Sequence, residues 1–202
     1  MAETDRRLRI GVLAVQGDFE AHGRVLRELG AEPREVRLPA DLEGLDGLVI
    51  PGGESTTISM GIEAAGLEQP IRAHHAAGRP ILGTCAGLIV CDDRHFGLLD
   101  ITARRNAFGR QLQSFETDLM VEGAGSEPVR AVFIRAPWVE RHGPEVEVLA
   151  AHESHPVVVR EGGVLACAFH PELTDDPRIH AIFMAMATTA AGREREREEA
   201  PG

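Results

Sequence analysis

The sequence predicts an α/β fold, a doubly wound and mostly parallel sheet flanked by helices, with additional antiparallel strands in the second half. Residues 9–15 and 46–50 are short apolar runs of the kind found in strands buried on both faces. Apolar residues at helical spacing follow the first run. From residue 101 onward the apolar runs are shorter and separated by turn residues, which is typical of antiparallel strands.

Strands and helices alternate over the first part of the chain. The first strand, Arg9–Val15, leads into a helix at Phe19–Leu29, with Asp18 as its N-cap and Gly30 as its C-terminal stop. The next expected elements are strands at Glu35–Leu38 and Asp46–Ile50, helices at Ile58–Ala65 and Leu67–Ala77, and a strand at Pro80–Gly83. Right-handed crossovers bring the carboxyl ends of such strands to one edge, so the loops that follow them meet there.

The second half is expected to return to this sheet. Its predicted strands are Gln113–Met120, Val129–Ile134, Val146–Ala151, Pro156–Arg160 and Val164–Phe169, followed by a helix at Pro177–Ala190. We expect a single domain at residues 8–191, an N-terminal extension at 1–7 and a disordered charged tail at 192–202.

Bulk composition narrows the class of protein. A chain of 202 residues, 43% of them hydrophobic, suits one α/β domain, and a net charge of −11 argues against a nucleic-acid or anionic-membrane surface. The three cysteines, Cys85, Cys91 and Cys167, lack the spacing of a disulfide or zinc framework, and the last two are expected to be core thiols. The charged residues 1–7 are not followed by the apolar region and cleavage site expected of a secretory leader, and no window approaches the ~18 apolar residues that a membrane span needs. We therefore expect a cytoplasmic protein without a membrane partner.

The residues that carry chemistry begin with a candidate nucleophile. Gly83-Thr-Cys-Ala-Gly87 follows a predicted strand, and this is the cysteine form of the nucleophile elbow, a strained turn that places the side chain in a cleft. Cys85 would then lie at a helix N-terminus, where the helix dipole favours the thiolate. The alternative is a buried structural cysteine.

A base and its orienting group are expected downstream. His170 and Glu172 are two residues apart, so in an extended segment they point to the same side. A carboxylate beside an imidazole fixes its tautomer and stabilises the imidazolium. A loop histidine is the alternative, but its joint occurrence with the elbow cysteine favours a Cys-His-Glu hydrolase.

A second glycine-rich loop, Pro51-Gly52-Gly53, follows another predicted strand. It lacks the lysine and third glycine of phosphate-binding loops. We expect the N–H groups of Gly53 and Ala86 to stabilise a tetrahedral oxyanion, whereas a plain tight turn is the alternative.

Other polar residues offer less specific signals. Arg105 and Arg135 lie beside predicted strand ends, where an arginine can bind a carboxylate, although surface arginine is the commoner explanation. The histidines at 74–75, 152 and 155 lack partners at metal-ligand spacing, so they are predicted to be ordinary surface histidines. No metal or cofactor is predicted.

Several longer motifs together resemble one family. The chain resembles class I, triad-type glutamine amidotransferases, which have a flavodoxin-like fold, and within them the glutaminase-subunit family of pyridoxal 5′-phosphate synthase. The resemblance covers about residues 9–186. It rests on the segments 11–18, 51–57, 83–88, 105–110, 133–137 and 169–174, of which Glu54-Ser-Thr-Thr57 and Arg105-Asn-Ala-Phe-Gly-Arg110 are the most specific.

The resemblance implies hydrolysis of L-glutamine to L-glutamate and ammonia. It implies Cys85 as nucleophile with His170 and Glu172, and L-glutamine contacts from Gly53, Glu54, Ser55, Arg105, Ile134 and Arg135. It also implies a (β/α)₈-barrel synthase partner in a large hetero-oligomer, which uses the ammonia to make pyridoxal 5′-phosphate (vitamin B6). The alternatives are a class I amidotransferase subunit of another pathway and a non-catalytic regulatory subunit on the same fold.

Overall fold

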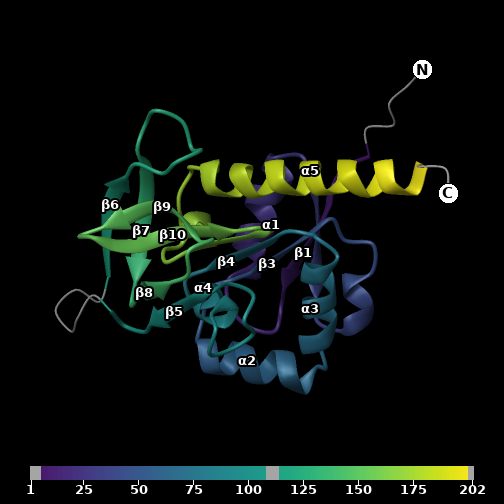
Figure 1. The fold of residues 1–202 in the computed structure, drawn as a ribbon, viewed down its shortest axis with the longest axis horizontal. Helices are drawn as coiled ribbons and strands as arrows, with labels where there is room; N and C mark the ends of the chain where they lie inside the picture. The colour runs from purple at the N-terminus through teal and green to yellow at the C-terminus, as the bar shows by residue number, and fades with distance from the viewer. Residues whose placement is uncertain (1–5, 108–113, 200–202) are drawn as a thin grey trace.

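The structure is a computed structural model that describes residues 6–107 and 114–199 (Figure 1). Its centre is a seven-stranded sheet. In spatial order the strands are β2 (Glu32–Val36), β1 (Arg9–Leu13), β3 (Gly47–Ile50), β4 (Ile81–Thr84), β11 (Val164–Cys167), β10 (His155–Glu161) and β9 (Glu147–His152). The first five strands pair in parallel, whereas β10 is antiparallel to both of its neighbours. The predicted mostly parallel sheet with antiparallel additions is therefore confirmed.

Two small antiparallel sheets complete the second half. β6 (Ser114–Leu119) pairs with β7 (Val129–Ile134), and β5 (Ile101–Arg104) pairs with β8 (Trp138–His142). The predicted strand at 129–134 is confirmed, while β5 and β8 were not predicted. Both are short, and β8 contains three charged or histidine residues among its five, so neither shows the apolar run by which strands are recognised.

Helices cover both faces of the central sheet. They are α1 (Phe19–Glu28), α2 (Ser55–Ala64), α3 (Glu68–Ala76), α4 (Ala86–Cys91) and α5 (Arg178–Glu199). Figure 1 shows α5 running along one face, with α2 and α3 on the other. α1 lies beside α5, because His22 of α1 contacts His180 of α5. The core lies between these layers and includes the fully buried Ile10, Leu48, Ile81, Leu165 and Phe183.

The first helix forms as predicted. The Asp18 Oδ1 atom accepts a hydrogen bond of 3.1 Å from the N–H of Ala21, which is the bond expected of an N-cap. Gly30 has a φ of +84°, so the chain leaves the helix in a conformation that favours glycine.

Two elements begin three residues earlier than predicted. The second strand was predicted at Glu35–Leu38 but runs over Glu32–Val36, because its register with β1 begins at the polar pair Arg9 and Glu32, which an apolar pattern does not reveal. α2 begins at Ser55 rather than Ile58. Glu54 caps this earlier start, since its carboxylate accepts from the N–H groups of Thr56 and Thr57.

The prediction of a disordered tail is wrong for residues 192–199. α5 continues through this alternating arginine and glutamate run to Glu199. Arginine and glutamate are good helix formers, and Arg79 pairs with Glu194 at 2.6 Å and so ties the extension to the start of β4. Residues 200–202 and most of the extension at 1–7 lie outside the described residues. The single-domain limits of 8–191 stay a prediction.

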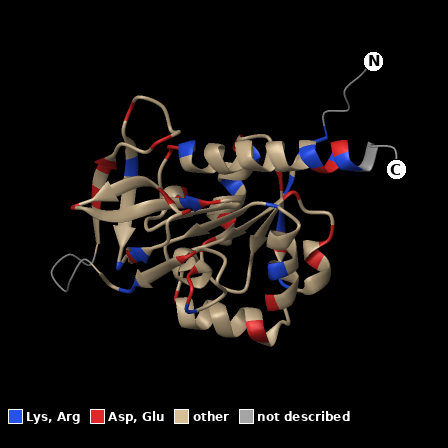
Figure 2. Cartoon of the chain, viewed as in Figure 1, with Lys and Arg blue, Asp and Glu red and all other residues tan. Residues whose placement is uncertain are grey.

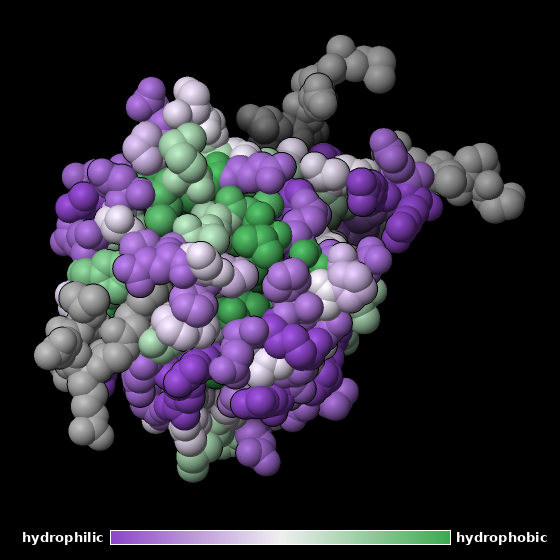
Figure 3. Space-filling view, turned by 60° about the vertical axis from the view of Figure 1, so that its left-hand side comes forward, coloured by the Kyte–Doolittle hydropathy of each residue, from purple (hydrophilic) through white to green (hydrophobic). Residues whose placement is uncertain are grey.

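The surface carries mixed charge. Basic and acidic residues are interspersed along the chain in the view of Figure 2. Figure 3 shows a mostly hydrophilic face with hydrophobic side chains gathered in one central strip. Among the described residues, no helix is both apolar and long enough to cross a membrane.

Candidate active site

Cys85 lies in a strained turn between β4 and α4. Its φ of 49° and ψ of −106° are unusual for a residue other than glycine, as expected of a nucleophile elbow. A Cβ atom at Gly87 would lie 2.1 Å from the carbonyl oxygen of Ile50, so only glycine allows α4 to pack this closely against β3. The Cys85 N–H donates to Cys167 O at 2.8 Å, which holds the turn to β11.

His170 and Glu172 meet, but through a turn and not an extended strand. β11 ends at Cys167, and Pro171–Leu173 form a 3₁₀ turn that brings His170 Nδ1 to 2.7 Å from Glu172 Oε1. The condition of an extended segment is therefore not met, although the two side chains are adjacent. Proline at 171 favours the turn because it fixes φ and provides no N–H for a strand ladder.

Electrostatics favour a charged His170. Burial opposes the charge, but hydrogen bonds to Cys85 and Glu172, together with their negative charges, raise the pKa of His170 to about 10. Burial, the largest single influence, favours a neutral Glu172, but the hydrogen bond from His170 and the charges of His22 and His170 together outweigh it and lower the pKa of that carboxyl. An imidazolium between a carboxylate and a thiolate can therefore exist at neutral pH.

The Pro51–Gly53 loop lies against this pair. A Cβ atom at Gly52 would lie 2.5 Å from His170 Cε1 and 3.2 Å from Cys85 Cβ, so a side chain there would displace the pair. The Gly52 N–H donates to Thr84 Oγ1 at 3.1 Å, and the Glu54 N–H donates to Gln16 Oε1 at 3.0 Å. Neither bond uses the N–H of Gly53, one of the two predicted oxyanion donors.

These elements enclose a cavity of about 330 Å³ at the carboxyl edge of the parallel strands. Its lining includes Cys85, Ala86 and His170, and also all six residues that the resemblance implies for glutamine: Gly53, Glu54, Ser55, Arg105, Ile134 and Arg135. Glu172 lies behind His170 and outside the lining. Larger cavities among the described residues, of about 500, 680 and 790 Å³, are lined by neither Cys85 nor His170.

Glu54 and Arg105 form an ion pair at the cavity. Arg105 Nη2 pairs with Glu54 Oε1, and Arg105 Nη1 donates to Thr56 Oγ1 at 3.1 Å. Hydrogen bonds from Thr57 and Thr56, and then from Arg105, lower the pKa of Glu54 to about 2. Glu54 is thus an anionic cap of α2 that also positions an arginine.

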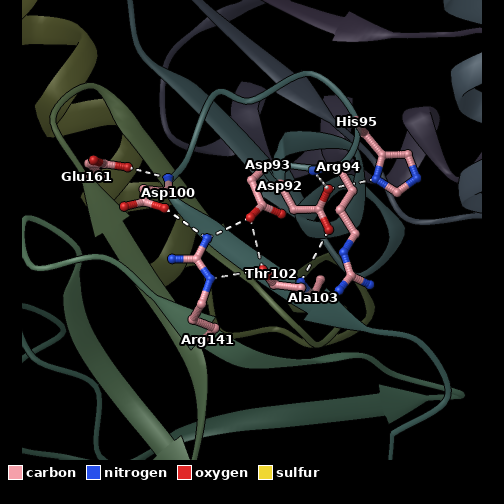
Figure 4. Close-up of polar contacts among 9 residues, drawn as sticks. All are labelled: Asp92, Asp93, Arg94, His95, Asp100, Thr102, Ala103, Arg141 and Glu161. Carbon is pink, nitrogen blue, oxygen red and sulfur yellow. Dashed lines mark hydrogen bonds and ion pairs between the residues drawn. The ribbon is translucent and has the colours of Figure 1, made fainter.

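A polar cluster anchors β5, the strand that precedes Arg105, to the end of the elbow helix (Figure 4). The buried Asp92, which directly follows α4, accepts hydrogen bonds from the Ala103 N–H at 3.2 Å and from His95 Nδ1 at 2.7 Å. Arg141 of β8 donates to Asp93 at 2.6 Å and to Asp100 at 3.1 Å. β5 is therefore fixed relative to the nucleophile, and Arg105 follows immediately.

Four further residues line the cavity without a function expected from the sequence: Gln16, Ile89, Asn106 and Pro137. Gln16 had a usable signal, because it follows the first apolar strand at the same edge as the glycine loops. Asn106 adjoins Arg105 and has a φ of 47°, a conformation that asparagine tolerates. Phe108, Gly109 and Arg110 of the same motif lie outside the described residues.

Two remaining predictions have different outcomes. Cys91 and Cys167 are fully buried free thiols, as predicted, and burial raises the pKa of Cys91 to about 12. The prediction that His74 is a surface residue is wrong: it is 4% exposed, because it lies on the face of α3 that packs against the sheet. Among the described residues, no group of three or more histidine, cysteine or acidic side chains could hold a metal ion.

Comparisons with known proteins agree on one family. A family model described as the SNO glutamine amidotransferase family matches residues 12–189. Pyridoxal 5′-phosphate synthase subunit PdxT of Parafrankia sp. (strain EAN1pec) is 52% identical, over 94% of this chain and 98% of the relative. The protein of the same name from Halalkalibacterium halodurans is 50% identical, over 91% of this chain and 96% of the relative.

Solved structures show the same similarity. A crystal structure described as a glutamine amidotransferase superposes with a TM-score of 0.83 at 47% identity, covering 89% of this chain and 98% of the other. A putative GMP synthase protein from Thermoplasma acidophilum gives a TM-score of 0.75 at 20% identity, covering 94% of this chain and 98% of the other, and at that identity it supports the fold alone.

Proposed function

This chain belongs to the SNO glutamine amidotransferase family, and from that premise we propose that its cavity hydrolyses L-glutamine and supplies ammonia to a pyridoxal 5′-phosphate synthase. The family makes the chain an enzyme subunit. The proposal adds the residues: Cys85 as nucleophile, His170 as acid and base, and Glu172 as the group that orients His170. Glutamine and a synthase partner follow from the names of the relatives that are 52% and 50% identical.

One observation carries the proposal. A strained elbow cysteine, a histidine hydrogen-bonded at 2.7 Å to a buried glutamate, and a glycine loop all meet at a single cavity of about 330 Å³. A buried structural cysteine would not require a φ of 49°, which costs about 1–3 kcal/mol and persists only where the surroundings impose it. A volume of this order suits a small polar metabolite.

The lining offers complementary groups for a zwitterionic amino acid. Arg135 is exposed at the cavity and makes no ion pair with any residue in the described ranges, whereas Arg105 is engaged by Glu54. Arg135 is therefore the cation available to the substrate carboxylate. The Ser55 Oγ atom is buried without a hydrogen-bond partner among the described residues, and it could bond the ammonium or carboxylate of glutamine.

The mechanism begins with attack of the Cys85 thiolate on the side-chain amide carbon of glutamine. The N–H groups of Gly53 and Ala86 stabilise the oxyanion of the tetrahedral intermediate. The His170 imidazolium gives its proton to the leaving nitrogen, so ammonia departs and a glutamyl thioester remains. Neutral His170 then takes a proton from water, whose hydroxide attacks the thioester and releases glutamate and the thiolate.

The ammonia must reach its acceptor before it meets bulk water, where it becomes protonated and loses its nucleophilicity. We infer that a (β/α)₈-barrel synthase subunit docks on this chain within a large hetero-oligomer and receives the ammonia directly. Because glycine peptides reorient easily, we expect the partner to fix the orientation of the Gly52–Gly53 peptide when it binds.

The test is glutamate release from L-glutamine by the purified chain, alone and with its synthase subunit, with the Cys85→Ala variant as the blank. Activity that requires both the thiol and the synthase is expected. Thiol-dependent activity that ignores the synthase would instead identify an amidotransferase with another acceptor. No activity in either state would favour a non-catalytic subunit. Free ammonia should restore pyridoxal 5′-phosphate formation by the Cys85→Ala complex.

A further inference from the structure

We propose that His22, which is outside the triad, is a positioning residue that holds Glu172 and Thr84 and thereby aligns both His170 and the Pro51–Gly53 loop. The inference rests on the proposed function, because it assigns His22 a role in the same reaction. His22 lies on α1, far before the triad histidine in sequence, and it is fully buried.

His22 contacts two groups at the base of the site. Its Nε2 atom lies 3.4 Å from Glu172 Oε2 and 3.2 Å from Thr84 Oγ1. The other carboxylate oxygen, Glu172 Oε1, is the one that His170 engages at 2.7 Å. The carboxylate of Glu172 is thus bracketed by two imidazoles, one on each oxygen.

His180 determines which nitrogen of His22 carries the proton. His180 Nε2 lies 2.9 Å from His22 Nδ1, and His180 Nδ1 is buried without a hydrogen-bond partner in the described part of the chain. A buried N–H without a partner is costly, so the proton of His180 belongs on Nε2 and is donated to His22 Nδ1. His22 then carries its own proton on Nε2, facing Glu172 and Thr84.

This tautomer places an N–H beside Glu172 Oε2. Oε2 is buried and has no hydrogen-bond partner among the described residues, and His22 Nε2 lies 3.4 Å from it. A buried carboxylate oxygen with no donor near it is costly, and the carboxylate would be free to rotate away from His170. His22 therefore fixes the rotation of the group that orients the base.

Thr84 extends the contact to the oxyanion loop. Thr84 Oγ1 accepts the Gly52 N–H at 3.1 Å, and Gly52 packs against both His170 and Cys85. His22, through Thr84, thus touches the loop that precedes the Gly53 N–H, and through Glu172 it touches the base. One buried side chain connects the two halves of the proposed catalytic machinery.

The charge of His22 suits this role. Burial lowers the pKa of His22, against an opposing contribution from Glu172, and the neighbouring His180 has its pKa lowered to about 3 by burial and by His22. A neutral His22 donates a hydrogen bond without neutralising Glu172. The negative charge of that carboxylate then remains available to the imidazolium of His170.

The first experiment compares two variants of His22 in the complex with the synthase subunit. His22→Phe keeps a planar ring but removes the donor, and we expect kcat for glutamate release to fall by about 10- to 100-fold with KM nearly unchanged, since His22 touches no substrate. His22→Gln places an amide N–H near the Nε2 position and should recover most of the lost kcat. Equal kcat in His22→Phe and the unsubstituted complex would overturn the inference.

His74→Phe is the matched control, because His74 is a buried histidine on the opposite edge of the sheet without a hydrogen bond to any side chain in the described ranges. It should change the unfolding midpoint without lowering kcat. A kcat loss in His74→Phe equal to that in His22→Phe would show a general effect of disturbed packing and overturn the positioning role.

A measurement on the unsubstituted chain keeps the inference testable if His22→Phe does not fold. Nitrogen NMR of the imidazoles should show His22 neutral and protonated on Nε2, whereas a proton on Nδ1, or titration near pH 6.5, would overturn the arrangement. This result does not depend on glutaminase activity. Absence of activity in the unsubstituted complex would overturn the proposed function. The tautomer of His22 would still test its contacts with Glu172, Thr84 and His180.

Discussion

The two edges of the central sheet contain the same kinds of buried polar group in different surroundings. At the carboxyl edge, Glu172 lies between His170 and His22. At the amino edge, Asp46 accepts hydrogen bonds from the Arg9 N–H at 2.7 Å and from Arg6 Nη2 at 2.6 Å. His74, at the same edge, has no carboxylate hydrogen-bonded to it among the described residues. Burial lowers the pKa of His22 at the carboxyl edge and of His74 at the amino edge. Burial alone therefore does not mark a functional histidine, whereas a continuous series of contacts to a strained nucleophile does.

The largest expected effect is a loss of kcat on substitution of Glu172, which the carboxylate of Asp46 at the amino edge should not share. Glu172→Gln should lower kcat for glutamate release by about 10³- to 10⁴-fold, because an amide can accept from one imidazole but faces the other with its own N–H groups, which forces a wrong tautomer. The assay is glutamate release in the presence of the synthase subunit.

Asp46→Asn is the matched control at the amino edge. It should lower the free energy of unfolding by about 1–3 kcal/mol through weaker hydrogen bonds and leave kcat unchanged. Comparable kcat losses in both variants would contradict a distinction between the edges.

A second pair of variants compares glycines. Gly52→Ala should lower kcat at least about 100-fold, because its Cβ would lie 2.5 Å from His170 Cε1 and misplace the base. Gly163→Ala, at the amino edge, meets no atom closer than 3.9 Å and should retain activity and stability. Steady-state kinetics and thermal unfolding of both variants provide the measurement, and normal kcat in Gly52→Ala would refute the close approach.

Stability should depend on pH in opposite directions at different histidines. Burial lowers the pKa values of His74 and His180 to about 4 and about 3. Their contribution to the free energy of unfolding is therefore complete above pH ~6.5 and is lost as the pH falls towards those values. The pKa of His170 is raised to about 10, so its contribution is complete below pH ~6.5 and is lost as pH rises towards 10. Each proton by which the folded and unfolded states differ changes the free energy of unfolding by about 1.4 kcal/mol per pH unit.

Urea unfolding over this pH range, on the chain and two variants, tests the assignment. His74→Leu should flatten the acidic side of the stability profile and leave the alkaline side unchanged. His170→Asn should flatten the alkaline side. A profile with the same acidic slope in His74→Leu and the unsubstituted chain would show that His74 is not held neutral by the fold.

The smallest effect is expected for the partly exposed ion pair at the amino edge. Arg79→Ala should lower the free energy of unfolding by less than about 1 kcal/mol, because Glu194 is 47% exposed and water screens the pair. Glutaminase activity should not change. Helicity measured by circular dichroism in this variant and in a chain ending at Ala191 would show whether the pair or the intrinsic propensity of the run sustains the end of α5.

The predicted strands and helices were most accurate where one local signal dominated. The Asp18 cap, the apolar first strand and the strand at 129–134 were predicted from adjacent residues and are confirmed. The edge strand β2 was displaced, because its polar register is imposed by β1 rather than by its own pattern. β5 and β8 were missed for a similar reason, since they are held by a polar cluster around Asp92 and Arg141.

For the candidate site, short motifs identified side chains but not their contacts. The elbow motif and the spacing of His170 and Glu172 identified a nucleophile and its companions, yet the adjacency of the latter two arises from a 3₁₀ turn at Pro171 and not from a strand. Nothing near His22 in the sequence points to Glu172, and His74 had the same appearance in the sequence as any surface histidine.

The sequence by itself determined the alternation of elements, the glycine-flanked cysteine and the family motifs, because each depends on residues close together in the chain, where backbone sterics and side-chain periodicity act directly. The tertiary structure alone decided which buried polar groups touch. His22, Thr84 and Glu172 come from three distant elements, and only the packing of α1 and α5 on one face of the sheet brings their donors and acceptors within hydrogen-bond distance. Contacts of that kind depend on the packing of segments that are far apart in the sequence, and a local sequence pattern carries no signal for that packing.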